Sequence, residues 1–194
     1  MDLSRTWCKG EVIDGAPAFR HAVNVAATIE ESFPEASEEL IAAVLLHDAP
    51  YFAPASVDLD AVLTEEVGAD VVRIVRAIEQ EHRALSEGDT PDLPVDDRDA
   101  IIASAADKYV SIDTITSRAY LSSDRAAYWD QRRPFVARVP YFVAFATEAE
   151  PYLPPNLADK LTVAVIRAAD ITEPYRPAAT AALHATRSDQ PSVC

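Results

Sequence analysis

The stretch EELIAAVLLHDAPYFAP, residues 38–54, contains an apolar helix pattern with an unusual ending. Apolar residues recur through positions 40–46 at helical spacing, and His47 and Asp48 then stand side by side just before Pro50. An imidazole and a carboxylate are costly to bury unless they have partners. The simplest interpretation is a core histidine beside a surface aspartate, and the rest of the chain decides whether the pair has a chemical role.

The composition indicates a globular helical protein. The chain has 194 residues and a mass of 21.1 kDa, with 49% hydrophobic and 25% charged residues. Only four glycines occur, alongside alanine-rich stretches with helical periodicity. We therefore predict an all-α, single-domain helical bundle over residues 1–174, followed by a partly frayed tail over residues 175–194.

The apolar periodicity predicts the positions of the helices. Ser37 is expected to cap the helix that ends at His47 and Asp48, and Ser56 to cap a helix that Gly68 stops. Residues 86–97 read as a polar loop, and no strand-like alternation is visible. The expected helices cover residues 19–33, 38–48, 57–68, 69–85, 97–118, 124–148 (kinked or split by Pro134 and Pro140) and 155–169.

The charge and the cysteines narrow the class of partner. The formal net charge is -15 with a pI of about 4.5, which disfavours nucleic acid and anionic membranes as partners. A small anionic substrate remains compatible if local arginines hold it. Cys8 and Cys194 stand far apart, and no signal peptide or membrane-spanning run is apparent, so we expect two free thiols in a cytoplasmic protein. The oligomeric state stays open, with a homodimer as one alternative.

Two further residues extend the His47–Asp48 pair into a candidate metal site. His21 lies on the first strong helix, and Asp107 lies within the apolar segment IIASAADKYVSI, residues 101–112. The four residues thus come from three helices, which is how helical bundles build metal sites in their core. Two imidazoles and two carboxylates suit an octahedral Mn²⁺, Fe²⁺, Co²⁺, Ni²⁺ or Mg²⁺ better than a structural zinc.

The order of these residues and their flanks resembles the HD-domain metal-dependent phosphohydrolases. The closest resemblance, over roughly residues 5–150, is to ppGpp hydrolase domains of the RelA/SpoT type and their small stand-alone relatives. It implies one divalent ion, typically Mn²⁺, held by His21, His47, Asp48 and Asp107, with Asp48 and Asp107 also acting in catalysis through a metal-activated water. The matching segments are FRHAVNVAATI (19–29), LIAAVLLHDA (40–49), LDAVLTEEVGADVVRIVRAI (59–78) and IIASAADKYVSIDTI (101–115).

The chain departs from this family pattern at two places. Family hydrolases carry a Glu-Asp pair shortly after the His-Asp, where this sequence has Tyr51 and Phe52, and Ser111 replaces a nucleotide-binding asparagine. Neither Tyr51 nor Phe52 is an effective base at neutral pH, although they could form a stacking floor or a lid. This departure argues against ppGpp as the substrate. Another carboxylate could act as the base, and the sequence does not choose among Glu65, Glu66, Glu79 and Glu81. Alternatively, the metal-bound hydroxide could act unaided.

The substrate would be a nucleotide or a related small phosphorylated metabolite. A basic stretch could hold its phosphates, or its arginines could pair within their helices with Asp124 and Asp130. That stretch comprises Lys108, Arg118, Arg125, Arg132, Arg133 and Arg138. The substrate-binding candidates are Lys108, Ser111, Tyr51, Phe52, Arg118 and Arg125.

Two alternatives to this hydrolase remain. One is a catalytically degenerate HD domain that binds a nucleotide or a metal as a regulatory module. The other, less favoured, is a di-iron HD oxygenase that would use His82 as an additional ligand. A second extra histidine is lacking for it, because His184 lies near the tail, and we expect His82 to be exposed on its helix.

Overall fold

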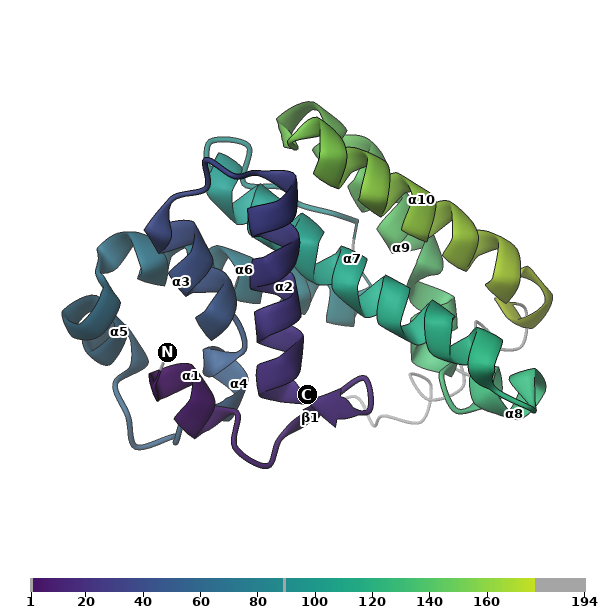
Figure 1. Cartoon of the computed structure of the whole chain (residues 1–194), viewed down its shortest axis with the longest axis horizontal. Helices are drawn as coiled ribbons and strands as arrows, with labels where there is room; N and C mark the ends of the chain where they lie inside the picture. The colour runs from purple at the N-terminus through teal and green to yellow at the C-terminus, as the bar shows by residue number, and fades with distance from the viewer. Residues whose placement is uncertain (1, 89, 177–194) are drawn as a thin grey trace, which may run out of the picture.

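The computed structural model describes residues 2–88 and 90–176. As predicted, the fold is all-α (Figure 1). Within the described ranges, no helix is long and apolar enough to cross a membrane. The elements in chain order are α1 (Asp2–Trp7), β1 (Val12–Ile13), β2 (Ala16–Pro17), α2 (Ala18–Ser32), α3 (Glu38–Leu46), α4 (Ala49–Phe52), α5 (Leu59–Val67), α6 (Ala69–Glu87), α7 (Arg98–Leu121), α8 (Arg125–Asp130), α9 (Arg133–Ala149), the 3-10 helix η1 (Glu150–Tyr152), α10 (Pro155–Thr172) and the 3-10 helix η2 (Glu173–Tyr175).

Helix α7 is the centre of the fold. Residues 100–108 of this helix are all buried, so its first half is enclosed on every side. Figure 1 shows α2 crossing α7 and α10 running along it, and α3, α6 and α9 also pack against α7. Four alanines within residues 100–108 keep this segment thin, which lets several helices approach it at once. Any polar side chain in this segment is therefore forced into the core.

The helix ends follow the capping rules, with one correction to the prediction. Ser37 caps α3 as expected, its side chain accepting a hydrogen bond from the Leu40 backbone N–H at 3.1 Å. The cap of α5, however, is Asp58 rather than Ser56, and it accepts from the Ala61 backbone N–H at 3.1 Å. Gly68 ends α5 with a φ of 97°, a conformation that glycine adopts without steric cost.

The predicted helix over residues 124–148 is split, and the structure shows where. Helix α8 ends at Asp130, and Pro134 lies in the first turn of α9, where its missing N–H costs no hydrogen bond. Pro140 lies inside α9 and does not end it. The predicted tail over residues 175–194 falls, from residue 177 onward, outside the described residues.

A short β-hairpin precedes α2, although the sequence analysis expected no strands. Val12 pairs with Pro17 and Ile13 with Ala16, which leaves Asp14 and Gly15 as a two-residue turn. Both turn residues have positive φ, 52° for Asp14 and 77° for Gly15, as a type I′ turn requires. Asp-Gly is among the preferred sequences for such a turn, so a signal was present, but strands of two residues are too short to show alternation.

Candidate metal centre

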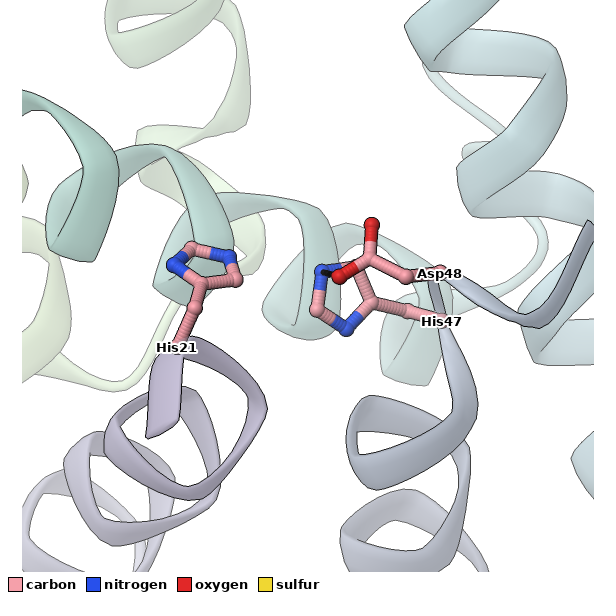
Figure 2. A group of neighbouring side chains, drawn as sticks. All are labelled: His21, His47 and Asp48. Atoms are coloured by element: carbon pink, nitrogen blue, oxygen red, sulfur yellow. Dashed lines mark ion pairs between the residues drawn. The ribbon is translucent and has the colours of Figure 1, made fainter. Parts of the chain in front are cut away.

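The four predicted ligands are carried by two long helices and by the junction between α3 and α4. His21 lies in the first turn of α2, and Asp107 lies in the enclosed half of α7. His47 follows the last residue of α3, and Asp48 precedes α4, which carries Pro50 in its first turn. Figure 2 shows His21 reaching from α2 toward His47 and Asp48 at the end of α3. All four residues are buried, with exposed fractions of 8% or less.

The distances within this group match a metal coordination sphere. His21, His47 and Asp48 each offer a ligand atom, and these atoms lie within 4.8 Å of one another. Asp107 Oδ1 is 2.7 Å from His21 Nε2 and 3.5 Å from His47 Nε2. Adjacent ligands of an octahedral ion, with bonds of about 2.1 Å, are about 3 Å apart. The side chains are therefore already spaced as neighbouring ligands would be.

The tautomer of His47 points its lone pair into the site. Its Nδ1 donates a hydrogen bond to the Val44 carbonyl oxygen at 2.7 Å, which leaves Nε2 as the nitrogen for a ligand. Nε2 of His47 and Oδ2 of Asp48 are both buried, and neither has a hydrogen-bond partner among the described residues. These two atoms lie 3.3 Å apart (Figure 2). A cation between the side chains would satisfy both atoms, so the residues present fit a divalent metal ion.

The charges of the protein itself also favour a positive charge among His47, Asp48 and Asp107. Burial by itself would lower the pKa of His47, but the charge of Asp48 and the nearby carboxylate of Asp107, 3.5 Å from Nε2, raise that pKa to about 9. Burial would raise the pKa of Asp107, but its hydrogen bonds with His21 and His82 and the nearby imidazole of His47 hold that pKa well below its usual value. A proton on His47 or a metal ion can supply this charge.

His82 belongs to the site, contrary to the expectation that it would be exposed. It lies on α6, its side chain is 18% exposed, and its Nε2 is 2.9 Å from Asp107 Oδ2. Its ring stacks on that of Tyr51, with the centroids 6.1 Å apart. The two oxygens of Asp107 thus face different histidines, His21 on one side and His82 on the other. His184, the other extra histidine in the sequence, lies outside the described residues.

A cavity of about 480 Å³ opens onto the group. His21, Asp48, His82 and Asp107 form part of its wall, which places the candidate ligands at a site that a small molecule can reach. The remaining wall is about equally divided between apolar or aromatic side chains and polar or charged ones. These residues are Ile13, Asp14, Tyr51, Leu85, Ser86, Lys108, Ser111, Ile115, Gln131, Arg132, Pro134, Phe135, Arg138 and Phe142.

The candidate substrate residues divide between those that line this cavity and those that do not. Tyr51, Lys108 and Ser111 line it. Phe52, Arg118 and Arg125 lie outside its lining. Arg125 stacks over the exposed Tyr120 ring at 5.5 Å, and Arg118 lies against the hairpin turn, where a Cβ on Gly15 would be 2.7 Å from its Nη1.

Lys108 lines the cavity, but its charge is already neutralised. Its ammonium donates a hydrogen bond to Glu81, and both side chains are only 2% exposed. Glu81 also accepts a hydrogen bond from the Tyr141 hydroxyl at 2.5 Å. Lys108 further lies over the Phe145 ring, 4.4 Å from its centroid. A substrate anion would therefore compete with a buried carboxylate for this lysine.

Two other arginines of the basic stretch do line the cavity. Arg132 lies 3.9 Å from the Tyr128 ring centroid, and its side chain donates to the Tyr128 carbonyl oxygen. Arg138 is half-buried, and within residues 2–88 and 90–176 its side chain has no hydrogen-bond or ion-pair partner. Burial lowers the pKa of Arg138. Arg133 instead pairs with Asp130, the partner that the pairing alternative named, although the two residues lie on α9 and α8 and not within one helix.

None of the glutamates proposed as a base lines the cavity. Glu81 is held by Lys108 and Tyr141, and Glu79 pairs with Arg76. Glu65 and Glu66 are exposed on α5.

A comparison with models of known families identifies the family of this chain. The family model described as an HD domain matches residues 3–109, which is more than half of the chain and includes all four predicted ligands. The chain therefore belongs to the HD-domain family. No protein of curated function and no solved structure matches it significantly. HD domains are in general metal-dependent hydrolases, and the structure contains a buried histidine–aspartate group, His21, His47 and Asp48, that could hold a metal ion.

Proposed function

We propose that this protein is a metal-dependent phosphohydrolase that acts on a nucleotide or a related small phosphorylated metabolite. The proposal rests chiefly on the unpartnered buried pair, His47 Nε2 and Asp48 Oδ2, which face each other 3.3 Å apart beside a cavity. Burying these two polar groups costs free energy unless a positive charge lies between them, supplied by a proton on His47 or by a metal ion. His21 and Asp107 would complete the ligand set, and Mn²⁺ is the ion that we favour.

A bound divalent ion lowers the pKa of a coordinated water and polarises a phosphate oxygen. The chain itself supplies the substrate contacts. Arg138 and Arg132 line the cavity with cationic side chains, which suit a phosphate group. Phe135 and Phe142 give the same cavity an apolar wall that suits a nucleobase or another planar group.

The proposal is tested by metal analysis joined to a phosphate-release screen. The purified protein should contain or take up one divalent ion, and it should release phosphate or pyrophosphate from some nucleotide when Mn²⁺ is added. We expect ppGpp to be a poor substrate because Tyr51 and Phe52 replace the family's carboxylate pair. Asp48→Asn should abolish the metal-stimulated rate, whereas Asp96→Asn, at an exposed loop position, should not. Turnover that persists in excess chelator would refute the proposal.

A regulatory module is the second candidate, and Tyr51 favours it. This residue lines the cavity where family hydrolases carry an acidic pair, and burial raises its pKa to about 12, so it cannot act as a base near neutral pH. A protein that binds Mn²⁺ and a nucleotide, yet turns over no compound in a broad panel, would match this candidate instead.

A further inference from the structure

Hydrolysis by an activated water needs a group that takes the proton from that water. In the part of the chain that the structure describes, the carboxylates lining the cavity are Asp14, Asp48 and Asp107. Asp48 and Asp107 are assigned to the ion. Asp14 is the carboxylate that remains.

We propose that Asp14, at the tip of the β1–β2 hairpin, is the catalytic base of this site, an inference that rests on the proposed hydrolytic function. It would take over the role of the carboxylate pair that Tyr51 and Phe52 replace. The base would thus come from a different element of the fold, the hairpin that directly precedes the helix carrying His21.

The hairpin places Asp14 firmly. The pairs Val12–Pro17 and Ile13–Ala16 leave a turn of only two residues, so the Asp14 side chain has little freedom to move away from the cavity. Arg118 of α7 packs against the turn, since a Cβ on Gly15 would meet its Nη1 at 2.7 Å. The hairpin is therefore held between α2, which continues from it, and the long central helix.

The surroundings of Asp14 suit a proton acceptor. Burial raises the pKa of Asp14, and this effect outweighs the hydrogen bond with Ser111, which lowers it. A raised pKa makes a carboxylate a stronger base at neutral pH. The titratable and polar groups that face Asp14 are His21 from α2, Asp107, Ser111 and Arg118 from α7, and Tyr128 from α8.

The proposed step exchanges one phosphorus–oxygen bond for another. The water oxygen forms a bond to phosphorus, and the bond between phosphorus and the leaving oxygen breaks. The proton lost by the water passes to the Asp14 carboxylate. That proton can then be transferred to the leaving oxygen, which restores the carboxylate, and no oxidant or reductant takes part.

The turn geometry offers two clean test variants, Asp14→Asn and Asp14→Gly. Asn and Gly both accept positive φ and both occur in type I′ turns, so either variant removes the carboxyl without straining the backbone. Asp96→Asn serves as the control, because this aspartate is exposed in a loop and does not line the cavity. Each protein is assayed for its melting temperature, for its Mn²⁺-dependent thermal shift, and for phosphate release between pH 5 and pH 9.

We expect both variants to melt at the parent temperature or up to about 4 °C above it, because Asn and Gly adopt a positive φ at a lower energetic cost than Asp. Their Mn²⁺ shift should match that of the parent. The kcat should fall by about 100-fold or more, the typical contribution of a general base, while Asp96→Asn keeps the parent rate. At Mn²⁺ concentrations that saturate the site at every pH, the parent rate should decline as acid protonates Asp14, and this acid limb should vanish in Asp14→Asn. Added formate should partly restore the rate of Asp14→Gly.

Parent-like rates in both variants would overturn the role of Asp14 while leaving the hydrolase intact. Loss of the Mn²⁺ shift in both variants would also overturn it, because Asp14 would then be part of the ion site. A parent protein that binds Mn²⁺ but turns over no phosphorylated compound would overturn the hydrolase itself, and the catalytic role of Asp14 with it.

Discussion

The charge state of His47 should make the stability of the metal-free protein fall as pH rises. Its imidazole is 1% exposed and faces Asp48 and Asp107, and these carboxylates raise its pKa from 6.5 to about 9. A histidine whose pKa is raised by folding contributes stability that is fully present below 6.5, its value in the unfolded chain. That contribution is lost as pH rises through about 9.

The size of this loss of stability follows from the same two pKa values of His47. A change of one unit in pKa corresponds to about 1.4 kcal/mol, so a pKa moved from 6.5 to about 9 corresponds to about 3 kcal/mol of unfolding free energy. For a domain of 150–250 residues, about 1 kcal/mol shifts the melting temperature by about 2–4 °C. Between pH 6.5 and pH 9 the metal-free protein should therefore lose roughly 6–12 °C through this one group.

A bound metal ion should offset the loss of stability at high pH. The ion must displace the proton from His47, so its apparent affinity should rise by about tenfold per pH unit until pH approaches the His47 pKa of about 9. At a hundredfold excess over the dissociation constant, the ion stabilises the fold by about 2.7 kcal/mol. Because the benefit of the ion grows with pH while that of the proton fades, the loaded protein should keep its melting temperature at pH 9.

The assay is differential scanning fluorimetry from pH 6 to pH 9 in chelator and in Mn²⁺. His47→Gln is the test variant, since it keeps a polar side chain but cannot carry the charge. Its metal-free melting temperature should not show the steep decline, and Mn²⁺ should not raise it. A parent protein whose metal-free stability is flat or rises over this range would refute the argument that the buried carboxylates hold a proton on His47 in place of the ion.

Three other perturbations test other contacts of the site. Replacing Lys108 with Met should lower the unfolding free energy by about 3–5 kcal/mol in a urea titration, because its carboxylate partner is left buried and unpaired. Arg138→Ala should raise KM by about tenfold or more for a phosphorylated substrate, since about 1.4 kcal/mol of charge-assisted binding is lost, whereas the matched Arg133→Ala should leave KM unchanged. His82→Ala should weaken Mn²⁺ binding by about 10–100-fold by calorimetry, because the ring holds a ligand carboxylate in place, and an unchanged affinity would remove it from the site.

The sequence was sufficient to select the candidate ligands because these residues interrupt a regular pattern. Asp107 lies within a run of apolar and alanine residues, and His47 with Asp48 ends an apolar helix, so each is conspicuous against its neighbours. The structure buries all of them, as those positions imply. The same periodicity predicted most helix limits to within a few residues.

His82 was missed although the pattern contained a signal. On α6 the buried positions Val71, Ile74, Val75 and Ile78 continue at helical spacing to positions 81 and 82. The apolar face of α6 thus ends in Glu81 and His82, two polar residues at positions that the helical spacing directs toward the core. A polar pair at the end of an apolar face was recognised on α3 but not on α6, because it comes one turn before the helix ends in an exposed, polar stretch.

The lining of the cavity could not be predicted, because it depends on how distant elements pack. Asp14 reaches the site because a two-residue turn folds the chain back onto α7. Arg138 reaches it because the chain ends α8 and then starts a separate helix, α9. Both depend on long-range packing that leaves no periodic trace in a single sequence. Proximity in sequence to the ligands correctly selected Tyr51, Lys108 and Ser111, but it failed for Phe52, which is not part of the cavity wall.

The buried pair of Lys108 and Glu81 is best understood through its neighbours. Adjacent residues on α6, Glu81 and His82, contact adjacent residues on α7, Lys108 and Asp107. A buried ion pair gains little stability over an apolar pair of the same size, because the two charges lose their hydration. It does, however, fix how one helix is rotated against the other, since breaking it leaves a charge unpaired. The pair therefore sets the register in which His82 meets Asp107, and the geometry of the candidate metal centre depends on an interaction that touches no metal.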